Sequence, residues 1–248
     1  FNYFINTTST AATPHRYILK DGNGKVVKEL QNNEEMLAKL KADAFTNKEF
    51  FTIPNAVGDQ MNAWMIKPKD FDPNKKYPVF MFQYSGPGSQ QVSNSWDGGN
   101  GIWFQHLAQK GYVIVCVDGR GTGYKGTEYK KVIYKNLGKY EIEDQITAAK
   151  WLGNQAFVDK SRIGIFGWSY GGYMASLAVT KGADVFKLGI AVAPVTNWRF
   201  YDTIYTERFL QTPQENPDGY DQNSPTTFAK DMKGKFLMIH GTADDNVH

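Results

Sequence analysis

From about residue 46 onward, short apolar runs alternate with helix-length amphipathic segments, and this alternation constrains the possible fold more than any other feature. Near-continuous apolar strands separated by helices are typical of a mostly parallel sheet with helices on both faces. The first two apolar runs follow each other directly, so the sheet is expected to begin antiparallel. We expect strands at 50–53, 62–66, 79–84, 112–117, 163–167, 188–193 and 236–240, and helices at 103–109, 142–152, 170–180 and around 228–232.

Residues 1–45 have a different pattern. The apolar segments 17–19 and 26–27 flank the tetrapeptide DGNG at 21–24, which predicts a hairpin, and a short helix is expected to begin at Asn32 or Asn33. These elements contain too little apolar sequence to form a core of their own. We therefore expect two parts: residues 1–45, the end of a preceding β-rich domain or an appendage, and residues 46–248, one α/β domain.

The composition excludes several classes of partner. Basic and acidic residues number 28 and 25 and are well mixed, so neither a nucleic-acid nor a membrane surface is expected. No apolar run reaches the roughly 18 residues of a membrane span. The single cysteine, Cys116, lies in an apolar run and is expected to be a buried strand residue.

Metal and cofactor motifs are also missing from the sequence. It contains no H-E-x-x-H pattern and no Cys/His spacing suited to zinc, so no metal is expected. The glycine-rich segment 118–126 lacks the phosphate-binding pattern of nucleotide sites, and no cofactor is expected. Within it, Asp118 and Arg120 are expected to form a structural turn and an ion pair near the active face.

The segment GWSYGGYMA, residues 167–175, places a serine between an expected strand and an expected helix. Ser169 fits G-x-S-x-G in the strand-turn-helix setting that this motif requires for a nucleophile. In that setting the backbone N–H of Tyr170 and the positive end of the helix dipole face a developing oxyanion. The alternative is that Ser169 only caps the helix, while the glycines allow close packing.

A nucleophilic serine needs a base and an acid that orients the base, and in sheets of this kind the chain order is serine, acid, histidine. The sequence HGTADDN at 240–246 follows an expected strand, so Asp244 or Asp245 is the candidate acid. The alternative is that both are solvated turn residues.

Four blocks occur in the order expected for one family: GWSYGGYMA, DGRGTGYKG, AVAPVTNWRFYDTIYTERF and HGTADDNVH. Together they resemble the catalytic domain of the prolyl oligopeptidase family of serine peptidases, and most closely its dipeptidyl peptidase branch. The resemblance runs from about residue 50 to the end of the sequence. It implies an α/β-hydrolase fold, and it implies that residues 1–45 are the end of a β-propeller domain.

The resemblance also assigns roles to individual residues. Ser169 resembles the nucleophile and Asp244 the orienting acid, and Tyr84 resembles the tyrosine that joins the Tyr170 N–H in binding the oxyanion. A phenol beside the nucleophile strand is suited to that role, and the alternative is that Tyr84 is a boundary tyrosine with a solvated hydroxyl. Without the family, the aromatics of 195–205 fit a core patch under a loop equally well. By resemblance, a compact apolar pocket suited to proline is lined by Val195, Trp198, Tyr201, Tyr205 and Val247, and Asn246 contacts the peptide backbone of the substrate.

The sequence departs from the family pattern in its histidines. The family's catalytic histidine lies in a loop well beyond the acid, whereas the histidines here are His15, His106, His240 and His248. We therefore expect a fragment that lacks the base and the domain that gates substrate entry, and that is inactive alone. The expected parent is a serine exopeptidase that releases N-terminal Xaa-Pro or Xaa-Ala dipeptides through an acyl-enzyme on Ser169.

Other outcomes remain open at this point. The parent could be a tripeptidyl, acylaminoacyl or oligopeptidase member of the family, or a catalytically silent binding module. The expected partners are peptides with proline second from the N-terminus, with a homodimer as a further possibility. An extracytoplasmic location is implied by the resemblance alone.

Overall fold

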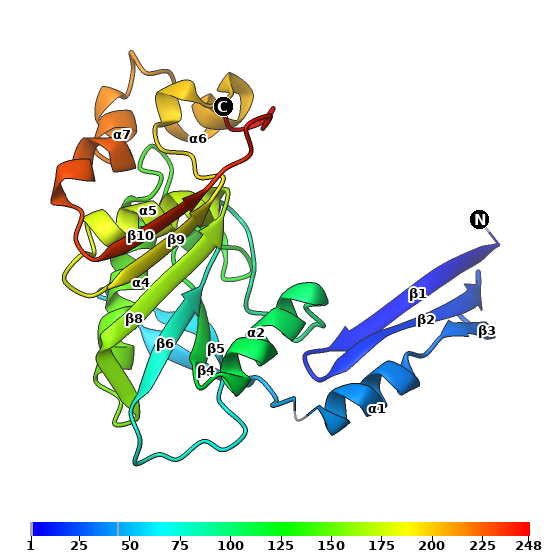
Figure 1. Cartoon of the computed structure of the whole chain (residues 1–248). Helices are drawn as coiled ribbons and strands as arrows, with labels where there is room; N and C mark the ends of the chain where they lie inside the picture. The colour runs from blue at the N-terminus through cyan, green and yellow to red at the C-terminus, as the bar shows by residue number, and fades with distance from the viewer. Residues whose placement is uncertain (1, 44) are drawn as a thin grey trace.

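The structure is a computed structural model and describes residues 2–43 and 45–248. It contains a three-stranded sheet at the N-terminus and a seven-stranded sheet in the rest of the chain. Figure 1 shows the small sheet, in blue, standing to one side of the larger layered unit. Among the described residues, no helix has the length and apolar character needed to cross a bilayer.

The N-terminal unit is an antiparallel meander followed by one helix. Strands β1 (Tyr3–Thr10), β2 (Thr13–Asp21) and β3 (Val26–Gln31) pair in sequence order, and helix α1 (Glu34–Ala42) follows. The predicted hairpin is confirmed: the Asp21 carboxylate accepts hydrogen bonds from the N–H groups of Asn23 and Lys25 across the turn. Strand β1 was not predicted, because its sequence, YFINTTST, does not alternate regularly between apolar and polar residues, as expected for a strand whose side chains are largely exposed.

The larger sheet has the strand order β10-β9-β8-β6-β7-β5-β4. Its strands are β4 (Glu49–Pro54), β5 (Gln60–Ile66), β6 (Tyr77–Phe82), β7 (Val113–Asp118), β8 (Val158–Trp168), β9 (Leu188–Val192) and β10 (Lys235–Ile239). Strand β5 pairs antiparallel with β4 and β7, and every other pairing is parallel. The predicted mostly parallel sheet with an antiparallel start is therefore confirmed.

Helices cover both faces of this sheet. Helix α2 (Gly99–Gln109) packs on β5 and β7, whereas α4 (Lys139–Gly153) and α5 (Tyr170–Thr180) pack on β8. Strand β7 shows the two faces directly, because alternate side chains of a strand point to opposite sides. Val113, Val115 and Val117 belong to the core under α4 and α5, and Ile114 and Cys116 to the core under α2. The predicted burial of Cys116 is confirmed.

Several short helices were missed or placed differently. The sequence did not predict α3 (Thr127–Lys131), α6 (Thr203–Leu210) or α7 (Pro217–Asp221), and the helix expected around 228–232 is a 3-10 helix over Pro225–Asp231. Strand β6 ends at Phe82, so Tyr84 lies in the loop after the strand and not within it. Figure 1 shows α6 close to the segment that follows β10.

Candidate active site

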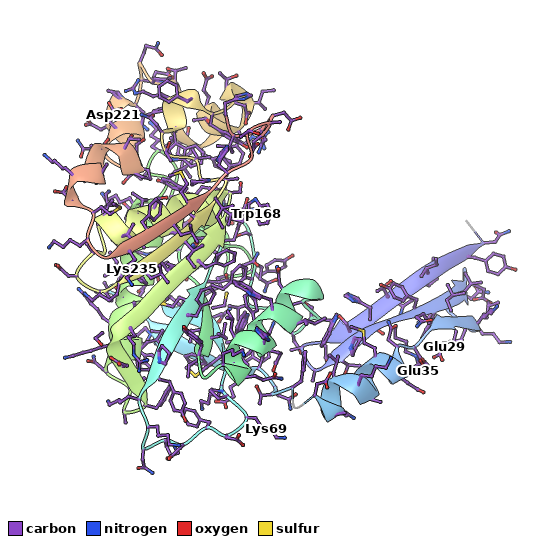
Figure 2. All side chains as sticks on the ribbon, in the orientation of Figure 1. Glu29, Glu35, Lys69, Trp168, Asp221 and Lys235 are labelled. Atoms are coloured by element: carbon purple, nitrogen blue, oxygen red, sulfur yellow. The ribbon has the colours of Figure 1, made fainter. Side chains whose placement is uncertain are left out.

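Ser169 lies on a strained turn between β8 and α5. Its backbone has φ 58° and ψ −116°, a conformation that non-glycine residues rarely adopt. The Ser169 N–H donates to the Val192 carbonyl, and the Ser169 carbonyl accepts from the Tyr173 N–H. Neighbouring backbone therefore holds the strain in place. Figure 2 labels Trp168, the residue before it, at the end of β8.

Close backbone contacts explain the glycines around the serine. A Cβ atom on Gly167 would overlap the backbone of Gly171, and a Cβ on Gly171 would lie 2.6 Å from the Gln83 carbonyl oxygen. The turn thus packs against itself and against the chain after β6. Glycine at both positions lets β8, α5 and the Tyr84 loop approach one another closely.

Tyr84 and Tyr170, the two candidate oxyanion donors, lie close to each other beside the serine turn. Tyr170 is the first residue of α5, so its N–H is one of the unsatisfied donors at a helix start. The ring of Tyr84 lies 6.1 Å from the ring of Tyr170, centroid to centroid. Gln83 holds this loop in place through its side-chain amide, which donates to the Gly171 carbonyl at 2.7 Å. The two rings are therefore neighbours, and the pairing of the Tyr84 hydroxyl with the Tyr170 N–H stays a prediction.

The candidate acid lies in the loop after β10. Trp168 of β8 pairs with Val192, and Val192 pairs with Ile239 of β10, so Ser169 and the acid loop leave the sheet at the same edge. They are separated by one intervening strand, a distance of roughly 10 Å between backbones. This proximity supports the predicted nucleophile and acid as members of one site.

The Asp244 carboxylate is held by its own loop. Its Oδ1 accepts hydrogen bonds from the N–H groups of Val247 at 2.9 Å and Asn246 at 3.0 Å. These bonds, followed by the charges of His240 and His248, lower the pKa of Asp244. Asp245 is exposed, whereas Asp244 is half-buried. Asp244 is therefore the better placed of the two candidate acids.

Two of the four histidines, His240 and His248, lie in the loop that carries Asp244, and the other two lie in elements that precede the serine. His240 Nε2 lies 2.7 Å from the Val247 carbonyl oxygen and 3.7 Å from Asp244 Oδ2, so this ring braces the acid loop. His15 is in β2, His106 is in α2, and His248 is exposed.

The predicted pocket residues gather in one aromatic cluster. The Trp198 ring stacks on Tyr205 at 5.9 Å and meets Tyr201 edge-on at 5.8 Å, and Tyr201 and Tyr205 meet edge-on at 5.6 Å. Trp198, Val195 and Val247 are buried, and the two tyrosines are half-buried. The Tyr201 hydroxyl donates to Asn246 Oδ1 at 3.2 Å, which connects this cluster to the acid loop.

The polar anchor behind the site differs from the one predicted. Asp118 does not pair with Arg120: its Oδ2 accepts from the N–H groups of Gln91 and Val92, and burial raises its pKa to about 6. Arg120 instead forms a buried two-pronged ion pair with Asp144 of α4. The sequence placed Asp118 and Arg120 close together, but the partner of each was set by tertiary packing.

The profile of the Prolyl oligopeptidase family matches residues 102–248 of this sequence. The chain belongs to the prolyl oligopeptidase family. It is 44% identical over 237 residues to dipeptidyl aminopeptidase B of Saccharomyces cerevisiae. This match covers 91% of the present chain and 28% of the yeast protein. It matches the crystal structure of Porphyromonas gingivalis dipeptidyl peptidase 4 with a TM-score of 0.94 and 48% identity, over 100% of this chain and 35% of that one.

These relatives confirm the predicted family and the α/β-hydrolase fold. The chain spans about a quarter to a third of the length of the curated relatives it matches.

One residue of this prolyl oligopeptidase domain escaped the sequence reasoning. Glu141, in the first turn of α4, is 1% exposed, and its Oε1 accepts a hydrogen bond of 2.6 Å from the Tyr170 hydroxyl. Burial raises the pKa of Glu141 to about 7, against the lowering effect of the Tyr170 bond. The sequence did contain a signal for its burial, because Glu141 lies at helical spacing from Gln145, Ala148 and Leu152, which share the buried face of α4.

Proposed function

We propose that these residues form the catalytic part of a serine exopeptidase that releases N-terminal Xaa-Pro or Xaa-Ala dipeptides through an acyl-enzyme on Ser169. The observation that carries the proposal is the strained serine turn, with a helix N-terminus on one side and Tyr84 on the other. The relatives dipeptidyl aminopeptidase B and dipeptidyl peptidase 4 support, by their names, the dipeptidyl specificity.

The proposed reaction uses the site residues in order. Ser169 Oγ attacks the carbonyl carbon of the second substrate residue and transfers its proton to a histidine base, which Asp244 orients. The tetrahedral oxyanion accepts hydrogen bonds from the Tyr170 N–H and the Tyr84 hydroxyl. The C–N bond then breaks, the histidine returns the proton to the leaving amine, and water hydrolyses the remaining ester.

The aromatic cluster supports proline as the residue whose carbonyl is attacked. A rigid apolar pocket suits a proline ring, because that ring has no rotatable side chain to immobilise and no N–H to satisfy. Val195, Trp198, Tyr201, Tyr205 and Val247 are proposed to line this pocket, and Asn246 to contact the substrate backbone.

We further propose that the histidine base and the groups that bind the substrate's free N-terminus lie outside these 248 residues. Residues 1–45 are proposed to be the end of a β-propeller domain, which the antiparallel β1–β3 meander supports. A homodimer of the full-length protein is also proposed, and its mass by light scattering would test it.

The test is Ser169→Ala in the full-length protein, assayed with a Gly-Pro anilide. Turnover is expected to fall by several powers of ten. Ser161→Ala is the matched control, because Ser161 is exposed in the same strand and bonds only to Asp159. Unchanged turnover in Ser169→Ala would overturn the proposal.

A second assay separates the alternatives within the family. Anilides with free and with blocked N-termini distinguish a dipeptidyl peptidase, which needs the free amine, from an acylaminoacyl or oligopeptidase. A Gly-Pro anilide that is bound but never cleaved would instead indicate a binding module.

A further inference from the structure

Glu141 is a buried carboxyl group directly behind the nucleophile turn. One oxygen, Oε1, accepts the Tyr170 hydroxyl at 2.6 Å. The other, Oε2, is buried and has no hydrogen-bond partner among residues 2–43 and 45–248. Burying a carboxyl group costs free energy that an apolar side chain of similar size would not. Packing alone therefore does not account for a glutamate at this position.

The partner of Glu141 has two roles in the proposed reaction. The Tyr170 backbone supplies a proposed oxyanion donor, and the Tyr170 ring lies beside both the Tyr84 ring and the Trp198 ring of the aromatic cluster. Ring centroids are 6.1 Å apart for Tyr84 and Tyr170, and 5.6 Å apart for Tyr170 and Trp198. The position of this one ring therefore affects both the oxyanion site and the wall of the aromatic cluster.

We propose that Glu141 is a positioning residue that, through its hydrogen bond to the Tyr170 hydroxyl, fixes the Tyr170 ring and thereby sets the preference for proline over alanine. The inference rests on the proposed function. It concerns a residue that does not touch the substrate and acts only through Tyr170.

The elements that carry the pair are well suited to this role. Glu141 is in the first turn of α4 and Tyr170 begins α5, so the bond joins the N-terminal ends of two packed helices. Tyr173, one turn further along α5, is fixed separately, because its hydroxyl contacts the Leu137 and Asn223 carbonyl oxygens. Tyr170 has Glu141 as its hydroxyl partner in the structure. Removing that carboxylate therefore frees the ring beside Trp198 while leaving Tyr173 anchored.

The experiment compares kcat/KM for Gly-Pro and Gly-Ala anilides in the full-length protein. Glu141→Gln is expected to lower the proline-to-alanine ratio roughly tenfold, the effect of weakening one charge-assisted hydrogen bond. Tyr170→Phe is expected to lower the ratio by a similar factor, since it removes the other side of the same bond. The double variant is expected to lose no more than either single variant. A general loss of active protein would reduce both substrates equally and leave the ratio unchanged.

The matched control is Glu143→Gln. This residue is on the same helix, but it is exposed, and its side chain pairs with the guanidinium of Arg120, which keeps its buried partner Asp144. The control is expected to leave the ratio unchanged.

An unchanged ratio in Glu141→Gln or in Tyr170→Phe, or additive losses in the double variant, would overturn the inference while the proposed function stands. If Glu141→Gln does not fold, the proline-to-alanine ratio of Tyr170→Phe decides whether the inference holds. If the wild-type protein cleaves neither anilide, the proposed function is wrong and this inference falls with it.

Discussion

At the scale of single residues, the site depends on conformations that are costly in isolation. Ser169 keeps a positive φ because the Val192 carbonyl and the first turn of α5 hold its backbone on both sides. Strain of this kind typically costs 1–3 kcal/mol and persists where the surrounding structure enforces it. The half-buried serine thus keeps this conformation at the expense of stability.

This strain leads to a prediction about stability. Replacing Ser169 by Gly is expected to give a variant about 1 kcal/mol more stable than Ser169→Ala, because glycine adopts positive φ without a Cβ clash. Both variants lack the hydroxyl, so the difference between them measures the cost of the positive φ for a residue that has a Cβ atom. Urea unfolding of the two proteins measures it, and an alanine variant at least as stable as the glycine variant would contradict the strain argument.

A second prediction concerns the Tyr84 hydroxyl. In the full-length protein, Tyr84→Phe is expected to lower kcat about a hundredfold with little change in KM, because the bond forms only to the developing oxyanion. Tyr112→Phe is the control, since Tyr112 is exposed and precedes β7 at the opposite end of the strands. Steady-state kinetics with a Gly-Pro anilide tests this, and a change confined to KM would exclude the oxyanion role.

At the scale of elements, loops after the parallel strands are tied to the sheet by buried acids. Asp118, at the end of β7, accepts the N–H groups of Gln91 and Val92 and so fixes the segment that follows Tyr84. Asp144 of α4 holds Arg120 in the loop after β7. The active face is therefore assembled by side chains that do not themselves reach it.

The anchor at Asp118 predicts a pH dependence of stability. Burial raises its folded-state pKa to about 6 from 3.8, so between these values the folded protein keeps a proton that the unfolded chain releases. The resulting stabilisation is complete below pH 3.8 and is lost as pH rises through about 6. The difference in free energy of unfolding between the wild type and Asp118→Asn is therefore expected to fall by roughly 2 kcal/mol between pH 4 and pH 7. Urea unfolding at several pH values tests this, and an advantage that grows with pH would refute it.

The sequence predicted those parts of the fold and site that depend on local patterns. Strand β8, the serine turn and α5 follow from one apolar run and one glycine motif, and the acid loop follows from the strand before it. Glu141 and the true partner of Arg120 could not be predicted with equal ease, because their burial depends on how α4 packs against α5 and the loop after β7. Short helices such as α6 carry too few residues for a periodic signal.

At the scale of the whole molecule, the edge strand β10 is the least protected part of the large sheet. Its residues Leu237, Met238 and Ile239 are each about half exposed. Apolar edge strands are sites of strand-to-strand association between molecules. Figure 1 shows β10, in red, at the outer side of the sheet.

The exposed edge predicts self-association of residues 1–248 expressed as such. Light scattering is expected to show particles larger than a monomer that grow with concentration, and Leu237→Lys is expected to reduce their size. Val57→Lys is the control, because Val57 is also apolar and exposed but lies in the turn between β4 and β5. A wild-type chain that stays monomeric at high concentration would contradict the prediction.

The hydrogen bond from Tyr201 to Asn246 has a consequence for protein engineering. It ties the aromatic cluster to the loop that carries Asp244, so a substitution that removes the Tyr201 hydroxyl is expected also to loosen the aspartate proposed to orient the base. Libraries designed to broaden substrate range at this position would then lose turnover together with selectivity. Variation at Val195, which makes no such connection, offers a route to new specificity at a smaller cost in rate.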